Sequence, residues 1–186
     1  MTHPIRMVSI DPGTNTVGVA VSEFNNDMTK MVVVDAMTID LQRLLLRYEK
    51  SRADVWGDRH AKLYILKDAI ARYLDAWRPV VVCSESPYMG RFPQVYAALT
   101  EAMTALSAGL YTYDPSIRLA TWEPSAVKLA MGVNGRSGDK ELMRRAITLR
   151  PDIVMCVPLV LLDEHAVDAV CVGYTHFCNH IRGLPS

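Results

Sequence analysis

Two acidic residues of this sequence each end an apolar run. Asp11 ends the run "MVSID", just before a Pro-Gly-Thr-Asn turn, and Glu85 ends the run "VVVCSE". A carboxylate at the tip of a buried strand is costly unless a partner compensates its charge. Because side chains alternate along a strand, Asp11 should share a face with Ser9, and Glu85 should likewise share one with Cys83. If the two strands are parallel neighbours, both acids lie at one sheet edge, where sites in open α/β sheets occur.

A further group of candidate residues lies in the segment "LLDEHAVDAV", residues 161–170. His165 and Asp168 are three positions apart, so they face the same side of a helix. Glu164 and Asp168 are four positions apart and share a face for the same reason. Either His165 or Glu164 could therefore supply the group beside Asp168.

Carboxylates in such a cluster raise one another's pKa unless a cation neutralises them. Mg²⁺ typically binds one or two carboxylates and accepts phosphate oxygens of a substrate. Two such ions about 4 Å apart can activate a water and stabilise the leaving oxygen of a phosphodiester. Imidazole is a better ligand for Mn²⁺ than for Mg²⁺, so Mn²⁺ is expected to substitute. The residue types thus indicate metal-dependent phosphodiester chemistry with two Mg²⁺ ions.

The elements that must position these residues follow from the hydrophobic pattern. Strands are predicted over residues 5–11, 15–24, 29–39, 78–86 and 116–121, and helices over 56–77, 93–110, 123–132, 138–149 and 163–181. The first three strands form hairpins, and strands and helices then alternate, which predicts a mixed sheet covered on both faces. No linker-like composition divides the chain, so we expect a single domain over residues 1–186.

Composition limits the classes of protein that need to be considered. Half of the 186 residues are hydrophobic, and no apolar run approaches the roughly 20 residues of a membrane span. The four scattered cysteines predict reduced thiols in the cytoplasm, and no signal peptide is expected before the first strand. The formal net charge is zero. Residues 128–150 nevertheless hold six basic side chains against two acidic ones, which indicates either a local basic face or a solvated helix.

Four segments in this order resemble the RuvC-type Holliday-junction resolvases of the ribonuclease-H-like superfamily. They are "SIDPGTNTVGVAV", "SESPYMGRFPQVYAAL", "WEPSAVKLAMGVNGRSGDK" and "DEHAVDAV". The resemblance covers most of the chain apart from about residues 38–56. It implies a ribonuclease-H-like fold with a mixed five-stranded sheet flanked by helices on both faces. It also implies that Asp11, Glu85, His165 and Asp168 are the metal-binding and catalytic residues.

The resemblance further implies a homodimer that cuts four-way DNA junctions with paired symmetric nicks, in a bacterial or phage-infected cytoplasm. Without the resemblance, Tyr88 could equally well be a residue at the edge of the core. With it, Tyr88 is expected to stack on an unpaired base. The other residues predicted to bind DNA are Arg91, Lys128, Arg136 and Lys140. The small residues of the helix 93–110 make it the candidate dimer interface. The loop "PYMGRFP", residues 87–93, leaves the cleavage preference open.

Three other readings remain. An actin-like ATPase or sugar kinase shares the strand, Asp, Gly-Thr turn and strand, but needs a second domain and a second phosphate loop. A non-cleaving junction-binding protein would be expected to have lost one of the strand-end acids. A related nuclease of the same superfamily, acting on RNA or on other branched DNA, is the nearest alternative. Zinc at Cys171, His176, Cys178 and His180 is disfavoured because their spacing contains no CxxC pair.

Overall fold

The computed structural model describes residues 5–24, 27–48, 50–90, 92–133 and 141–182. The strands are β1 (Arg6–Asp11), β2 (Thr16–Phe24), β3 (Met31–Asp40), β4 (Val81–Glu85), β5 (Leu119–Trp122) and β6 (Ile153–Met155). The α-helices are α1 (Leu41–Tyr48), α2 (Lys50–Trp56), α3 (Asp58–Trp77), α4 (Pro93–Tyr113), α5 (Pro124–Met131), α6 (Glu141–Thr148) and α7 (Glu164–His176). A short 3₁₀ helix, η1 (Leu159–Leu161), precedes α7, and a π-helical turn, η2 (Phe177–Ile181), follows it.

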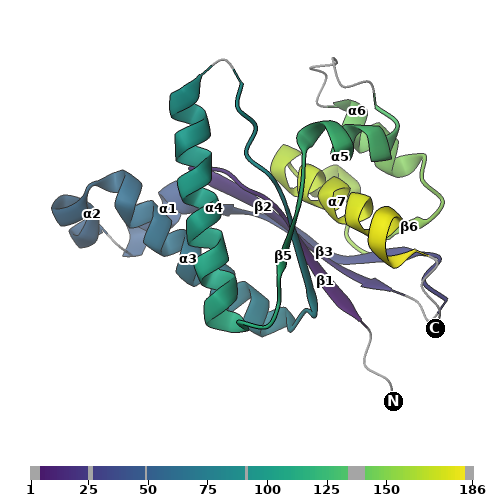
Figure 1. Ribbon diagram of the computed structural model, residues 1–186, viewed down its shortest axis with the longest axis horizontal. Coiled ribbons are helices and arrows are strands. Elements are labelled where there is room, and N and C mark those ends of the chain that lie inside the picture. The colour runs from purple at the N-terminus through teal and green to yellow at the C-terminus, as the bar shows by residue number, and fades with distance from the viewer. Residues whose placement is uncertain (1–4, 25–26, 49, 91, 134–140, 183–186) are drawn as a thin grey trace.

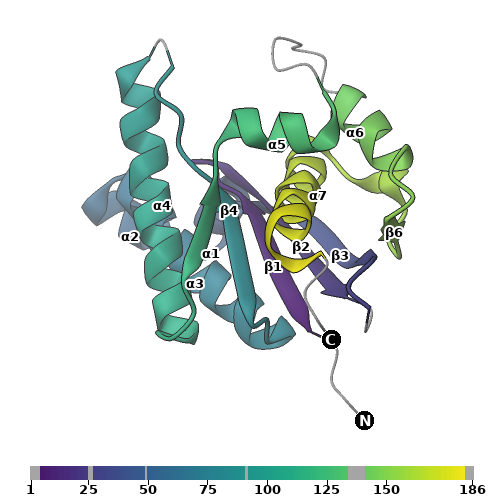
Figure 2. The same cartoon turned by 45° about the vertical axis from the view of Figure 1, so that its right-hand side comes forward.

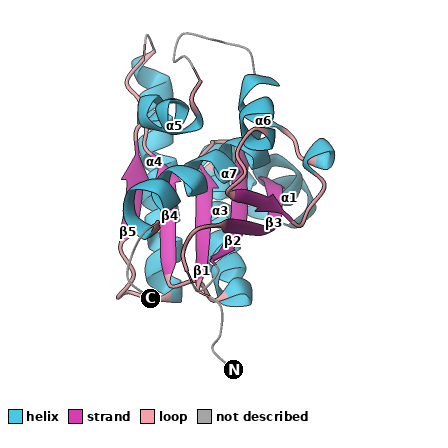
Figure 3. Ribbon diagram, turned by 90° about the vertical axis from the view of Figure 1, so that its right-hand side faces the viewer, coloured by secondary structure: helices cyan, strands magenta, loops and turns pink. Residues whose placement is uncertain are grey.

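The strands form one mixed sheet in the order β5-β4-β1-β2-β3-β6. Figure 3 labels the strands from β5 to β3 in this sheet. β1, β2 and β3 are antiparallel neighbours, whereas β4 is parallel to β1 and β5 is parallel to β4. The parallel pairing of the two strands that end in acids is therefore confirmed. The predicted strand number is wrong, because β6 adds a sixth strand parallel to β3. Its three residues lie in the short apolar run "IVMCV", which is too brief to show a period.

Helices cover both faces of the sheet, as predicted (Figures 1 and 2). α7 lies across one face, and the core beneath it contains Met7, Ala20 and Cys83. On the other face α1, α3 and α4 pack against Val8, Ile10 and their neighbours. Consecutive residues of β1 thus enter opposite cores, and this alternation decides which side chains reach the α7 face.

The helix α4 packs tightly against α3 through small residues. Ala102 is fully buried, and a Cβ at Gly109 would lie 2.6 Å from the carbonyl oxygen of Lys67 on α3. Part of the small-residue face that we expected at a dimer interface is therefore used within the chain. Residues 41–48 and 50–55, to which the hydrophobic pattern assigned no element, form α1 and nearly all of α2.

All four cysteines have free thiols in the structure. Across the described parts of the chain, no helix combines the length and apolarity needed to cross a membrane.

Candidate active site

Asp11 and Glu85 lie beside each other at the carboxyl ends of β1 and β4. The register pairs Ile10 with Ser84, so the next residue of each strand is an acid. Ser9 is fully buried beneath α7, where a Cβ at Gly173 would lie 2.7 Å from its hydroxyl oxygen. Two residues further along β1, Asp11 therefore lies on the same α7 face. The prediction that both acids meet at one sheet edge is confirmed by the strand pairing.

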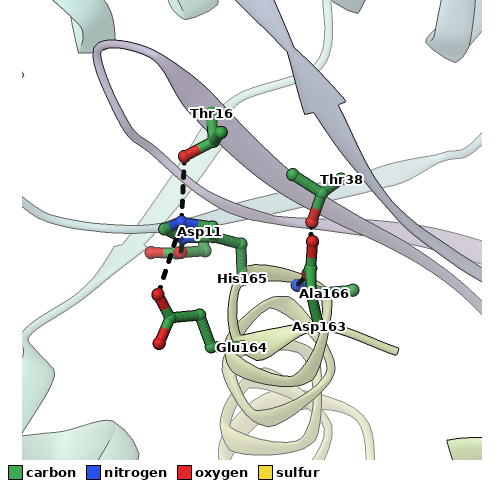
Figure 4. Close-up of polar contacts among 7 residues, drawn as sticks. All are labelled: Asp11, Thr16, Thr38, Asp163, Glu164, His165 and Ala166. Carbon is green, nitrogen blue, oxygen red and sulfur yellow. Dashed lines mark hydrogen bonds and ion pairs between the residues drawn. The ribbon is translucent and has the colours of Figure 1, made fainter. Parts of the chain in front are cut away.

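The first turn of α7 is held over this edge by two local contacts. Asp163 caps the helix, because its Oδ1 accepts a hydrogen bond from the backbone nitrogen of Ala166 at 3.0 Å. The hydroxyl of Thr38 on β3 donates to the same oxygen (Figure 4). A Cβ at Gly18 of β2 would lie 2.0 Å from the carbonyl oxygen of His165, so only glycine permits this approach of helix to sheet. The cap and the glycine together fix where α7 begins.

The imidazole ring of His165 lies near three side chains, one at the end of β1, one at the start of β2 and one beside it on α7 (Figure 4). Its Nδ1 lies 3.1 Å from Oδ2 of Asp11, and its Nε2 lies 2.9 Å from Oγ1 of Thr16. Oε1 of Glu164 is farther away, at 3.9 Å from Nε2. The hydrogen bond to Asp11 is the main cause that raises the pKa of His165, and burial opposes it. His165 is thus joined directly to Asp11, whereas Glu164 lies at the side of the ring.

These groups line one cleft of about 540 Å³ at the sheet edge. Its polar lining includes Asp11, Glu85, Lys128, Glu164, His165 and Asp168. All four predicted metal-binding residues therefore face the same cavity, although they come from β1, β4 and α7. Glu164 lines it as well, so the cavity contains both candidates for the group beside Asp168.

Burial and mutual repulsion perturb two of the carboxyl groups strongly. Burial, and next the charges of Asp11 and Asp168, raise the pKa of Glu85 to about 8, against an opposing effect of Lys128. Burial, followed by the charge of Asp11, raises the pKa of Asp168 to about 6. Such shifts are typical of acids that are crowded without a neutralising cation.

The donor set of the cleft fits a hard divalent cation. Carboxylate oxygens are the ligands such ions prefer, and a bound cation would lower the raised pKa values of Glu85 and Asp168. Within the described residues, no three side chains of His, Cys, Asp or Glu are already arranged closely enough to hold a metal. The chemistry of the residues therefore fits a metal, while the ligand shell is not preformed in this structure.

Replacing Glu85 with Gln should stabilise the metal-free protein at alkaline pH. The folded-state pKa of Glu85 is raised from 4.5 to about 8, so ionising this carboxyl costs more in the folded than in the unfolded chain. The stability contributed by its proton is fully present below about pH 4.5 and is lost as the pH rises toward about 8. Glu85→Gln removes this pH-dependent loss of stability. Each ~1 kcal/mol gained in the free energy of unfolding raises Tm by about 2–4 °C in a chain of this size.

Thermal melts in EDTA at pH 8 and pH 5 test this expectation. The variant should melt above the wild type at pH 8 and close to it at pH 5, and Mg²⁺ should reduce the difference at pH 8. Equal melting temperatures at pH 8 in EDTA would contradict the crowding of acids inferred from the structure.

The structure describes two of the five residues that were predicted to bind DNA, Tyr88 and Lys128. Tyr88 lies in the loop between β4 and α4 with 71% of its surface exposed, so it is not a core residue. Lys128 on α5 lines the acidic cleft. Arg91, Arg136 and Lys140 lie outside the described residues.

Two other basic residues of the segment 128–150 stabilise the fold. Arg144 donates to the carbonyl oxygens of Leu159 and Leu162, which anchors the loop before α7. Arg150 donates to the carbonyl oxygen of Ala130 at 2.8 Å. These two side chains of the segment are therefore used in contacts within the fold.

The residues considered for zinc form a different kind of cluster. Nε1 of Trp122 lies 3.3 Å from Nδ1 of His176, and the rings of Trp122 and His180 are 5.3 Å apart. Burial lowers the pKa of His176 to about 4. These contacts are aromatic packing at the end of α7.

One residue of the site has no signal in the sequence pattern. Thr16 contacts His165 across 149 positions of the chain. A threonine that begins a strand after a turn is common, and only the placement of α7 shows that this hydroxyl meets the imidazole ring.

Comparison with known proteins extends the sequence resemblance to the whole fold. No protein-family model matches the chain. The crossover junction endodeoxyribonuclease RuvC of Chloroflexus aurantiacus is 26% identical over 177 residues, which cover 92% of each chain. The structure of Thermus thermophilus RuvC aligns with a TM-score of 0.67 at 15% identity, covering 96% of this chain and 98% of that one.

Two further solved structures have the same architecture. T. thermophilus RuvC in complex with a Holliday junction substrate aligns with a TM-score of 0.66 at 15% identity and covers 92% of each chain. The yeast mitochondrial Holliday junction resolvase Ydc2 aligns with a TM-score of 0.62 at 15% identity, covering 98% of this chain and 84% of that one.

The mixed sheet and its flanking helices are the architecture of the solved RuvC and Holliday junction resolvase structures. The sequence is similar to curated RuvC proteins over nearly the whole length of the chain. The predicted resemblance to the RuvC-type resolvases is therefore confirmed, in sequence and in fold.

Proposed function

We propose that this chain is a RuvC-type endonuclease that resolves four-way DNA junctions by hydrolysing phosphodiester bonds. The observation that supports this most strongly is the convergence of Asp11, Glu85, His165 and Asp168 on one cleft at the sheet edge. The similarity to RuvC along nearly the whole chain supports the same substrate class. We regard residues 1–186 as one nuclease domain that acts in a bacterial or phage-infected cytoplasm.

RuvC-like nucleases generally need a divalent metal ion. In our proposal Asp11, Glu85, His165 and Asp168 hold two Mg²⁺ ions, for which Mn²⁺ can substitute. When bound, these ions would polarise the scissile phosphate and activate a water for attack. The carboxylates serve as ligands only in their ionised form, so the raised pKa values of Glu85 and Asp168 make metal binding compete with protons.

Basic and aromatic residues around the cleft are proposed to hold the DNA. Lys128 lines the cleft, where an ammonium group can neutralise a phosphate. Tyr88 is proposed to stack on an unpaired base, since its ring is exposed in the loop that follows Glu85. Arg136 and Lys140 remain predicted phosphate contacts, and Arg91 remains a predicted DNA-binding residue.

Replacing Lys128 with Ala should weaken binding to all junction sequences equally. A lysine that neutralises one phosphate releases about one counterion, so the slope of log K against log salt should fall by about one. Lys67→Ala, which removes a lysine on α3 outside the cleft lining, is the matched control and should leave the slope unchanged. Filter binding at several salt concentrations measures both variants, and an unaltered slope for Lys128→Ala would exclude a phosphate contact.

We further propose that the protein acts as a homodimer, because two sites facing two symmetric strands produce paired nicks. Of the small residues on α4, Ala102 is buried against α3, whereas Ala97 is exposed and remains a candidate for the interface. Paired nicks leave two duplex products that a ligase can seal, and unpaired nicks do not.

A substrate panel tests the proposed function. Labelled four-way junction, linear duplex and RNA–DNA hybrid are incubated with the protein, with and without Mg²⁺. We expect cleavage of the junction alone, in symmetric strands and only with the metal. Preferred cleavage of the hybrid would identify another nuclease of the superfamily, and binding without cleavage would identify a junction-binding protein.

A further inference from the structure

We propose that Thr16 is a positioning residue, whose hydroxyl holds Nε2 of His165 so that Nδ1 faces the carboxylate of Asp11. This inference rests on the proposed function, because it concerns how the metal-binding group of that site is arranged. It assigns a role to a residue outside the three acids and the histidine of the predicted site.

The geometry places the imidazole between two fixed partners. Oγ1 of Thr16 lies 2.9 Å from Nε2 of His165, and Oδ2 of Asp11 lies 3.1 Å from Nδ1 (Figure 4). The partners are on opposite sides of one turn, since Asp11 ends β1 and Thr16 begins β2. The ring bridges the two ends of this turn from the first turn of α7.

Rigid surroundings keep the hydroxyl in place. Val17, the next residue of β2, is fully buried. The preceding residue, Asn15, accepts a hydrogen bond on its backbone oxygen from the nitrogen of Leu41 at 2.8 Å, and its Oδ1 accepts one from Nζ of Lys62 at 2.7 Å. Threonine is also β-branched, which limits the rotation of its side chain. The oxygen of Thr16 is therefore a fixed point against which the imidazole can be oriented.

The chemistry of a histidine ligand requires such a point. A histidine that binds a metal usually bonds an oxygen with its other ring nitrogen, which fixes the tautomer and the plane of the ring. Here Thr16 occupies Nε2, and the remaining nitrogen, Nδ1, faces Asp11, another proposed ligand. In the neutral ring of the metal-free protein, the carboxylate of Asp11 can only accept, which favours the proton on Nδ1 and leaves Nε2 to accept from the hydroxyl of Thr16. With a metal at Nδ1, the proton would be on Nε2 and the same hydroxyl would accept from it. Oε1 of Glu164 also lies on the Nε2 side of the ring, but at 3.9 Å.

Variants at Thr16 test this role. Thr16→Val replaces the hydroxyl by a methyl group of similar size, and Thr16→Ser restores the hydroxyl. Thr112→Val is the matched control, because Oγ1 of Thr112 only bonds the carbonyl oxygen of Ala108 within α4. Mn²⁺ affinity is measured by calorimetry without DNA, and kcat and KM are measured on a four-way junction. Nitrogen-15 NMR of the metal-free protein reports the tautomer of His165.

We expect Thr16→Val to lower both Mn²⁺ affinity and kcat by about 10- to 100-fold, as is typical when the outer partner of a metal-binding histidine is lost. KM for the junction should not change, because no DNA contact is removed. The NMR signals of His165 should shift from one dominant tautomer toward a mixture. Thr16→Ser should restore all three properties, and Thr112→Val should match the wild type.

Two outcomes would overturn the inference. One is wild-type Mn²⁺ affinity and an unchanged tautomer in Thr16→Val. The other is a defect in Thr16→Ser as large as that in Thr16→Val, which would indicate a steric role. If Thr16→Val does not fold, Thr16→Ala removes the hydroxyl without adding a methyl group in its place and must show the same losses. A wild-type protein that neither cleaves junctions nor binds Mn²⁺ would instead refute the proposed function itself.

Discussion

Asp11→Asn is expected to abolish cleavage of a four-way junction while leaving junction binding intact. The substitution changes one carboxylate oxygen into an amide nitrogen, which removes a proposed metal ligand and adds no bulk. It also weakens the partner of His165 Nδ1, since Oδ2 of Asp11 lies 3.1 Å from that nitrogen. Loss of a group that stabilises transition-state charge costs at least about 10²–10³-fold in rate. Binding should be unchanged or tighter, because one anion beside the phosphates is lost.

Asp40→Asn provides the matched control for this experiment. Asp40 also ends a strand, but its carboxylate accepts from the backbone nitrogen of Arg43 at the start of α1, a role that asparagine can fill. Single-turnover cleavage in Mg²⁺ and gel-shift binding in EDTA measure the two properties separately. Cleavage by Asp11→Asn at the wild-type rate would show that the metal site lies elsewhere.

The second large effect distinguishes His165 from Glu164 as the fourth group of the site. His165→Ala should be nearly inactive in Mg²⁺, because it removes the side chain that joins α7 to both Asp11 and Thr16. His165→Asp should retain activity, since a carboxylate is a better Mg²⁺ ligand than imidazole. Glu164→Ala should remain close to the wild type, because that carboxylate lies 3.9 Å from the ring and is 40% exposed.

The three variants are compared under the same single-turnover conditions. An inactive Glu164→Ala together with an active His165→Ala would show that Glu164 is the fourth ligand. Repeating the comparison in Mn²⁺ tests whether the metal preference of imidazole explains the result. Replacing Mg²⁺ with Mn²⁺ should raise the cleavage rate of the wild type more than that of His165→Asp.

Local patterns in the sequence predicted the parts of the site that belong to regular elements. Asp11 and Glu85 end apolar runs, and the alternation of side chains along β1 placed Asp11 on the face of Ser9, as the structure shows. The spacing of His165 and Asp168 likewise predicted one helix face. These predictions succeed because strand and helix periods depend on near neighbours in the chain.

The remaining features depend on contacts between distant segments. The need for glycine at position 18 arises from the carbonyl oxygen of His165, which the local sequence of β2 does not reveal. The bond between Thr16 and His165 likewise exists only because α7 begins at this point of the sheet. β6 was missed because three residues that pair with β3 show no period of their own.

The central claim is that Asp11, Glu85, His165 and Asp168 form a divalent-metal centre. Crystals of the wild-type protein grown with Mn²⁺ would test it most directly, through anomalous diffraction recorded above and below the manganese absorption edge. We expect anomalous peaks within coordination distance of Asp11, Glu85 and Asp168, and their loss in Asp11→Asn. Manganese bound elsewhere, or a cleft without manganese in a protein that cleaves junctions under the same conditions, would contradict it.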